Sequence, residues 1–225
     1  MSDKRRTAAS LKLLGGRLCL DFVNTLDWRG RDTPQEFLNT FDDLVVWSRH
    51  VGITSKEESR QLHRLADQSG SNASEVLNRA IRLRETIYRL FSASITGREP
   101  NKEDLNFFNE NLSFSMQDSK ITRTAEGYSL DNIGNKKQLD WILNPIIHSA
   151  VDILVSNELK KVKACADPAC GWLFYDVSRN QSRRWCDMQD CGNRAKAGRF
   201  YKRKQRENSG KSTKSTGPQD KLTCL

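Results

Sequence analysis

Four of the six cysteines lie close together in the sequence and could form one metal site. Cys165 and Cys170 form one pair and Cys186 and Cys191 another, with four residues inside each pair and fifteen between the pairs. No secretion signal is recognisable, so we expect a cytoplasmic chain, in which such pairs favour metal binding over disulfides. Four thiolates complete the shell of a structural Zn²⁺ ion; iron and two disulfides are the alternatives. The sequence therefore predicts a structural zinc ion that stabilises the fold of this segment and has no catalytic role.

The segment between the two pairs supplies a small core for such a zinc finger. Residues 171–176 alternate large side chains as a short strand does. The aromatic candidates, for which packing is favoured over stacking on nucleic-acid bases, are Trp172, Phe174 and Trp185. Metal binding contributes ~10 to 16 kcal/mol to folding in isolated finger peptides. We therefore expect replacement of Cys170 or Cys186 to unfold this segment and to leave residues 1–150 intact.

The positive charge of the chain is concentrated around these cysteines. The formal net charge is +9, and residues 160–206 carry 13 lysines and arginines against four acidic residues. The rest of the chain is therefore close to neutral. This asymmetry is typical of a nucleic-acid-binding module attached to a neutral body, with a solvated basic helix as the alternative.

The stretch after Cys191 has helical character, with seven cations and no acidic residue up to Arg206. At 100° per residue, five of these cations share one face, which suits a phosphate backbone or a major groove. Three further arginines, Arg179, Arg183 and Arg184, lie on the loop before the third cysteine. Asn193 and Arg194 could read a base, grip a phosphate or hold the start of the helix. The candidate nucleic-acid contacts are Arg183, Arg184, Asn193, Arg194, Lys196, Arg199, Lys202, Arg203 and Arg206.

The N-terminal part of the chain shows mainly helical periodicity. Residues 119–134 instead alternate around Glu126-Gly127, which predicts a β-hairpin. Pro145 indicates a kink or a later start in the last helix. The fold class expected is therefore mainly α (α+β). The expected helices run from a Thr33–Glu36 capping box to Gly52, from Ser55 onward, and over 72–96, 101–113 and 138–159.

These patterns divide the chain into a helical domain at 11–159, a four-cysteine zinc finger at 160–206 that ends in a basic helix, and a disordered tail at 207–225.

No apolar run is long enough to span a membrane. The histidines are scattered and no catalytic motif is recognisable, so an enzyme is not expected. Cys19 lies in an apolar run and is expected in the core.

One polar cluster in the helical domain has two interpretations. If residues 18–25 are helical, then Asp21, Asn24 and Thr25 could converge and line a pocket for a small-molecule effector. Equally, Asp21 and Asn24 could cap helices or fasten the loop at Trp28-Arg29. We favour the structural interpretation.

The segment 165–204 resembles the CGNR zinc finger of bacterial proteins, whose signature is spelled by Cys191, Gly192, Asn193 and Arg194. Residues 15–30, "GGRLCLDFVNTLDWRG", are similar to the opening of the ABATE domain that usually precedes this finger. The resemblance implies a stress-induced transcription regulator whose finger binds DNA.

Several alternatives remain open at this stage. Charge alone cannot distinguish DNA from RNA as the partner. An RNA- or protein-binding adaptor is the second hypothesis, and an enzyme with an N-terminal pocket is the third. A homodimer is common among bacterial regulators, but no heptad or apolar patch in the sequence demonstrates one.

Overall fold

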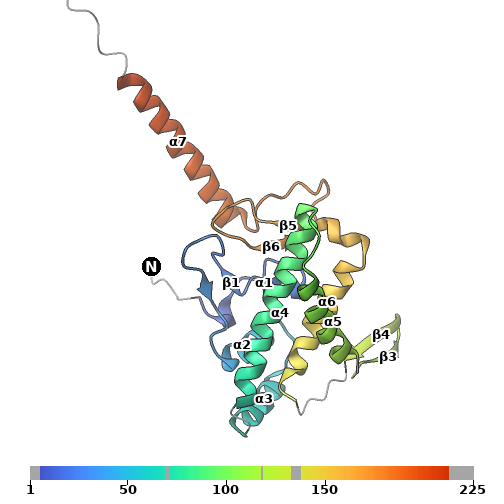
Figure 1. Ribbon diagram of the computed structural model, residues 1–225. Coiled ribbons are helices and arrows are strands. Elements are labelled where there is room, and N and C mark those ends of the chain that lie inside the picture. Colours follow the sequence, from blue (N-terminus) through green and yellow to red (C-terminus); the bar gives the residue numbers. More distant parts are fainter. Residues whose placement is uncertain (1–5, 69–70, 118, 133–137, 213–225) are drawn as a thin grey trace, which may run out of the picture. The chain divides into compact units, whose positions relative to one another are not determined.

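The computed structural model describes residues 6–68, 71–117, 119–132 and 138–212 (Figure 1). Contacts divide the chain into two compact units, Met1–Cys186 and Asp187–Leu225. The domain boundary expected at residue 160 therefore lies inside the first unit. Within the described ranges, no helix combines the length and the apolar character needed to cross a membrane.

The first unit is built mainly from helices, as predicted. Its longest helix, α4, buries Ala80, Leu83, Ile87 and Leu90 at three- and four-residue spacings, which gives it one core-facing side. Figure 1 shows α4 beside α5, and α5 in turn packs against α6. The helices of this unit are α1 (Leu18–Val23), α2 (Phe41–His50), α3 (Lys56–Gln68), α4 (Ser71–Thr96), α5 (Lys102–Gln117) and α6 (Asn144–Leu154), with 3₁₀ turns η1 (Ala8–Ser10), η2 (Asp140–Leu143) and η3 (Asn157–Lys161).

The core of the first unit forms where α1 packs against α4 and α6. Cys19, Leu20, Phe22 and Val23 of α1 are fully buried, and the Phe22 ring lies 5.2 Å from the Trp47 ring. Burying each side chain of this size stabilises the fold by ~1.5–3 kcal/mol. The expectation that Cys19 is a core residue is confirmed.

Several elements agree with their sequence patterns. The side chain of Ser55 accepts from the Glu58 N–H, and the Glu58 carboxylate accepts from the Ser55 N–H, so α3 begins at a capping box. Helix α4 ends before Gly97, whose φ of 66° suits glycine. Strands β3 (Ser119–Thr124) and β4 (Gly127–Asn132) form the predicted hairpin. The side chains of Ile121, Tyr128 and Leu130 on this hairpin are exposed.

The start of α2 differs from the prediction. Strand β1 (Leu26–Asp27) pairs with β2 (Gln35–Glu36), so the Thr33–Glu36 capping box does not form. The Glu36 carboxylate instead receives two hydrogen bonds from the Arg84 guanidinium, at 2.6 and 2.7 Å. Thr40 and Asp43 form the capping box that starts α2, because each side chain accepts from the other residue's N–H.

The predicted helix over 138–159 is also divided. Pro145 lies in the first turn of α6 and marks a later start instead of a kink, since its missing N–H costs nothing there. Helix α6 ends at Leu154, and Ser156 then caps the separate turn η3. Strands β5 (Val162–Ala164) and β6 (Leu173–Tyr175) follow as an antiparallel pair.

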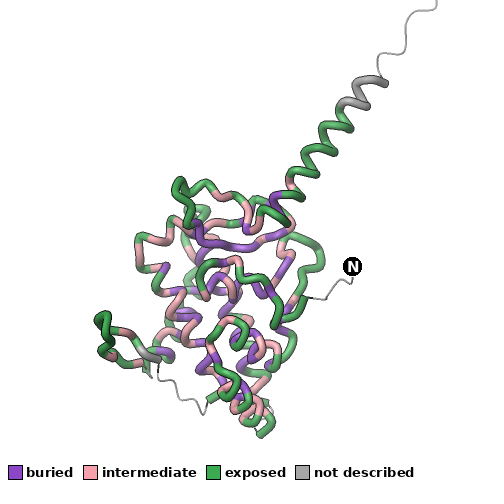
Figure 2. The backbone as a smooth tube through the Cα atoms, turned by 180° about the vertical axis from the view of Figure 1, so that it is seen from behind, coloured by how far each residue is buried: buried purple, intermediate pink, exposed green. Residues whose placement is uncertain are grey.

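The second unit consists of a short π-helical turn, η4 (Met188–Gly192), and one continuous helix, α7 (Asn193–Ser212). Most residues of α7 up to Arg206 are exposed, as the colouring of the backbone in Figure 2 shows. The basic helix expected after Cys191 is therefore present. It extends past residue 206, where the tail was expected to begin, and residues 213–225 of that tail lie outside the described ranges.

Candidate metal centre

The four paired cysteines come together in the structure. Their sulfur atoms all lie within 4.8 Å of one another, and every one of these residues is buried. The Sγ atoms of Cys170 and Cys186 are 3.6 Å apart. A tetrahedral zinc site with bonds of about 2.3 Å places its sulfurs about 3.8 Å apart, so the four thiols fit such an ion closely.

Strands β5 and β6 position the first pair of cysteines. Cys165 follows β5 directly, and its N–H donates to the Trp172 carbonyl at 2.8 Å. The Cys170 N–H donates to the Asp167 carbonyl at 3.0 Å and closes the turn. Trp172 and Phe174 are buried, which confirms them as core residues of the finger. We call residues 165–175, the turn and strand that carry these cysteines, the first knuckle.

Hydrogen bonds among the sulfurs shift the pKa values of the thiols in opposite directions. Bonds from Cys170 and Cys186 hold the pKa of Cys165 well below its usual range, against the effect of burial. The bonds that Cys170 makes to Cys165 and Cys186, together with burial, raise the pKa of Cys170. The cluster therefore retains protons that a metal ion must displace.

Asp176 organises the loop that leads to the second pair. Its buried carboxylate accepts from Lys163 Nζ at 2.9 Å and from the N–H groups of Ser178 and Arg183 at 2.9 and 3.0 Å. Burial alone would raise the pKa of Asp176, but these bonds outweigh burial and lower the pKa below its usual range. The loop is thus anchored on an ionised carboxylate.

Arg183 differs from its expected role at a nucleic-acid surface. Its guanidinium donates to the backbone carbonyls of Trp185 and Cys186 and lies 4.4 Å from the centre of the Phe174 ring. These contacts hold the backbone of the third cysteine. Arg184, by contrast, is exposed, with its guanidinium 5.2 Å from the Trp185 ring.

The CGNR tetrapeptide holds the fourth cysteine and the start of α7. A Cβ at Gly192 would lie 2.9 Å from Sδ of Met188, a half-exposed side chain that packs over this turn. The Asn193 amide donates to the Gln189 carbonyl at 2.9 Å. The Arg194 guanidinium donates to Cys191 Sγ at 3.1 Å. Of the three roles considered for Asn193 and Arg194, the structure therefore favours holding the helix start.

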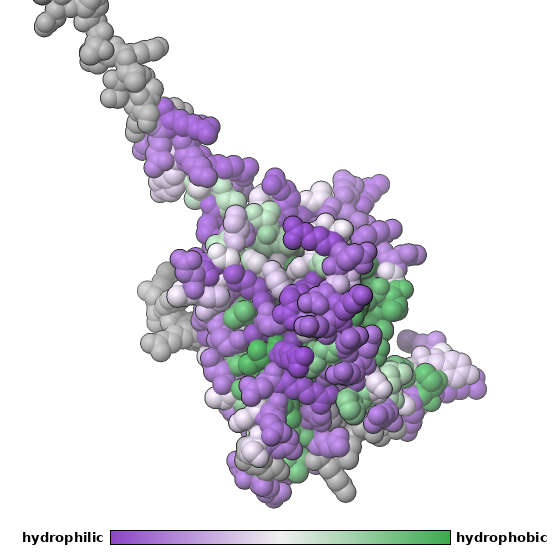
Figure 3. Space-filling view, viewed as in Figure 1, coloured by the Kyte–Doolittle hydropathy of each residue, from purple (hydrophilic) through white to green (hydrophobic). Residues whose placement is uncertain are grey.

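The remaining predicted contacts are exposed. Figure 3 shows hydrophilic side chains over much of the described part of α7. Phe200 and Tyr201 are also exposed, with their rings in edge contact at 6.0 Å. Arg194 is exposed, and the other exposed cations among the predicted contacts are Arg184, Lys196, Arg199, Lys202, Arg203 and Arg206.

The three residues expected at an effector pocket have partners inside the fold. The Asp21 carboxylate accepts from the Gly15 N–H at 2.7 Å. The buried Asn24 amide bonds to the Leu173 backbone, and the buried Thr25 hydroxyl donates to the Phe22 carbonyl. This agrees with the structural interpretation, except that Asn24 fastens β6 and not the loop at Trp28.

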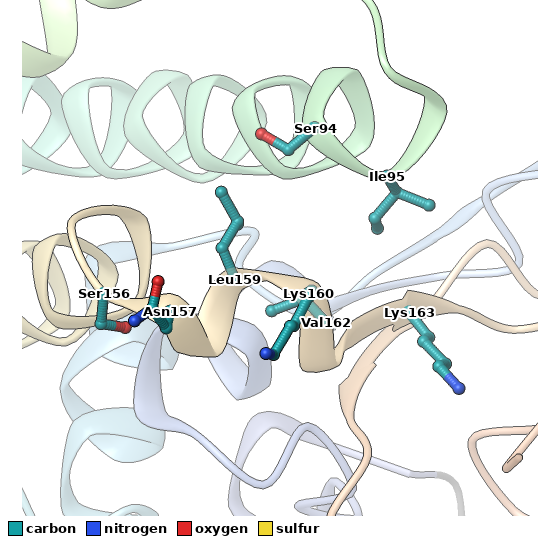
Figure 4. Close-up of a pocket in the computed structure, with 8 residues that line it drawn as sticks. All are labelled: Ser94, Ile95, Ser156, Asn157, Leu159, Lys160, Val162 and Lys163. Carbon is teal, nitrogen blue, oxygen red and sulfur yellow. The ribbon is translucent and has the colours of Figure 1, made fainter. Parts of the chain in front are cut away.

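Two neighbouring cavities in the first unit are lined by other residues. One has a volume of about 620 Å³ and lies between the end of α4 and η3, where Figure 4 shows Leu159 pointing toward Ser94 and Lys160 pointing away from α4. The second is about 340 Å³, shares Ser94 and Leu159 with the first, and is mostly apolar. Its apolar lining includes Leu90, Phe108, Leu112, Val151, Leu154 and Leu159.

Sequence reasoning missed the residues that support the first knuckle from the N-terminal segment. The Arg29 N–H donates to the Cys170 carbonyl at 3.1 Å, and the Gly15 carbonyl accepts from the Tyr175 N–H at 2.8 Å. A Cβ at Gly30 would lie 1.8 Å from the Pro168 carbonyl oxygen. The glycines of residues 15–30 were the available signal, because a glycine often marks close backbone approach.

The sequence matches two families. Residues 16–157, more than half of the chain, match ABATE, described as "Putative stress-induced transcription regulator". Residues 161–204 match the family described as "CGNR zinc finger". No curated protein matches the chain. The chain therefore belongs to the ABATE family and carries a CGNR zinc finger after its ABATE domain.

Proposed function

We propose that this protein is a DNA-binding transcription regulator whose finger contacts the duplex through α7. The observation that carries the proposal is the exposed cation face of α7, on a helix that begins two residues after a cysteine of the metal cluster. Cations on one face of a helix can track phosphates, and arginine can also pair with guanine edges. The ABATE description of a transcription regulator supports the same assignment.

The metal that fits this site best is Zn²⁺, held by the thiolates of Cys165, Cys170, Cys186 and Cys191. Four cysteine ligands leave no position open for water or substrate, so the metal has a structural role. Arg194 then compensates part of the negative charge on Cys191, and Arg183 fixes the backbone at Cys186. The finger match supports zinc over iron.

The experiment that tests this function is a selection of bound sequences from random DNA duplexes, with the purified full-length protein. An enriched motif is the expected result for a regulator. Binding should also fall steeply with salt, because five phosphate contacts predict a log–log slope of about −4.5. No enrichment, together with tighter binding to single-stranded RNA than to duplex DNA, would contradict the proposal and favour the adaptor hypothesis.

The ABATE domain supplies a place for a regulatory ligand. The mostly apolar cavity of about 340 Å³ suits a small, mainly apolar effector with one polar group that could reach Ser94 or Asn109. A thermal-shift screen of such compounds tests this part of the proposal. The expected hit raises the melting temperature of the wild-type protein but not that of Leu112→Arg, which fills the cavity with charge. A hit that stabilises both proteins equally would place the ligand elsewhere.

A further inference from the structure

The first knuckle is fastened to the N-terminal segment 15–30 through backbone atoms. Leu173 of β6 lies three residues after Cys170, and its N–H and carbonyl both bond to the side-chain amide of Asn24, at 3.0 and 2.8 Å. The Asn24 amide thus pairs with β6 as a neighbouring strand would. Because Asn24 is fully buried, water cannot replace either bond without opening the core.

The turn of the first knuckle is held from the same segment. Arg29 donates its backbone N–H to Cys170 O, and its side-chain stem occupies the space that a Cβ at Gly171 would need, at 2.5 Å. Gly171 has a φ of 71°, so both its conformation and its contact require glycine. Gly30 packs directly on the carbonyl of Pro168. Neither Gly171 nor Gly30 therefore has space for a Cβ atom at this contact.

Arg29 is itself immobilised by α4. Its guanidinium bonds twice to the Glu85 carboxylate, at 2.7 and 3.0 Å, and lies 4.2 Å from the centre of the Tyr88 ring. Glu85 also accepts from Arg84, which is 2% exposed and bonds to Glu36. A continuous set of ion pairs thus connects α4 to the residue that supports Cys170.

We infer that Asn24, Arg29 and Gly30 of the ABATE domain are positioning residues for the metal site, so that this domain controls how firmly the finger retains zinc. Thiolates held on a rigid platform need less ordering when the metal binds, and loss of such supporting contacts typically costs roughly 10- to 100-fold in metal affinity. The reverse also holds, because zinc that binds only the folded knuckle stabilises the domain on which the knuckle packs. The inference rests on the proposed zinc site.

The test is the rate at which full-length, zinc-loaded protein gives up its metal to an excess of a chromogenic chelator. Asn24→Ala should release zinc about tenfold faster than wild type. The matched control is Asn111→Ala, because Asn111 is also buried and bonds to Phe107 and Arg79, away from the knuckle. Asn111→Ala should lower the melting temperature and leave the release rate within about twofold of wild type.

A second pair of variants keeps the test decisive if Asn24→Ala does not fold. Gly30→Ala adds one methyl group toward the knuckle from an exposed loop and should also speed release. Gly198→Ala, in α7, meets no atom within 4 Å and should not. The visible spectrum of the Co²⁺-substituted protein should change in Gly30→Ala and not in Gly198→Ala, because cobalt absorption reports ligand geometry.

Equal release rates for Gly30→Ala and Gly198→Ala would overturn the inference. So would release from Asn111→Ala as fast as from Asn24→Ala, since that result would assign the effect to global stability. A wild-type protein that binds no zinc would instead overturn the proposed function, before the variants are compared.

Discussion

The two halves of the finger differ in what surrounds them. The first knuckle is mostly buried and is bonded to the N-terminal segment, and the guanidinium of Arg183, on the loop after it, holds the backbone at Cys186. The second half, α7, carries exposed cations and exposed aromatic rings. The comparison indicates that one half of the finger is packed into the protein, while the other half leaves charged and aromatic side chains exposed.

The largest effect is expected from loss of one metal ligand in the buried half. Cys170→Ser should abolish stoichiometric zinc binding and lower the free energy of unfolding of the first unit by roughly 3 kcal/mol or more, because the first knuckle packs on that unit. Elemental analysis and thermal unfolding measure the two effects. Cys19→Ala, which alters a buried cysteine outside the cluster, should keep its zinc.

This outcome would differ from the sequence-based expectation that residues 1–150 are independent of the finger. An unchanged unfolding transition for these residues in Cys170→Ser would show that the packing of the first knuckle contributes little. In that case the first knuckle would not differ from α7 in its contribution to the stability of these residues.

An intermediate effect is expected from the two adjacent arginines. Arg183→Ala removes the bonds to the carbonyls of Trp185 and Cys186 and should speed zinc release several-fold. Arg184→Ala removes an exposed cation and should weaken DNA binding with little effect on zinc. Zinc release and DNA affinity should be measured in parallel for both variants. Faster zinc release from Arg184→Ala together with weaker DNA binding by Arg183→Ala would contradict these assignments.

The smallest effect concerns Asp21, whose pKa burial raises to about 6 in spite of the bond from Gly15. Because the folded pKa lies above the ordinary value of about 3.9, Asp21 favours folding when protonated, and this contribution is lost as pH rises from about 4 to 6. Asp21→Asn keeps an acceptor for Gly15 and removes the titration. Between about pH 4 and 7, wild type should lose about 1–2 kcal/mol of stability relative to this variant. The assignment would be contradicted if denaturant titrations gave the same pH dependence of the free energy of unfolding for wild type and Asp21→Asn.

The sequence predicted most of what depends on local pattern. The cysteine spacing indicated the metal cluster, and the apolar periodicity and Gly97 defined α4. The predicted start of α2 was wrong because the Thr33–Glu36 segment has the same capping-box pattern as Thr40 and Asp43. The choice between them depends on Arg84, which is distant in sequence and draws Glu36 into a partly buried ion pair.

The roles of the polar residues could be predicted only in part. The charge pattern located α7, but it could not separate Arg183, which turns inward, from Arg184, which is exposed. Asn24 presented a similar difficulty, since its partner Leu173 is 149 residues away. Such pairings are decided by tertiary packing, which local periodicity does not encode.

The measurement that tests the central claim most directly is the salt dependence of duplex DNA binding by Arg199→Ala/Arg203→Ala, followed by fluorescence anisotropy. The matched control is Arg60→Ala/Arg64→Ala, which removes the same charge from exposed positions of α3. If α7 contacts phosphates, its variant should keep its zinc, bind roughly 50-fold more weakly near about 0.1 M salt, and show a slope about 1.8 units shallower than wild type. The α3 variant should match wild type. Equal slopes for the α7 variant and wild type would contradict the assignment of α7 as the nucleic-acid contact.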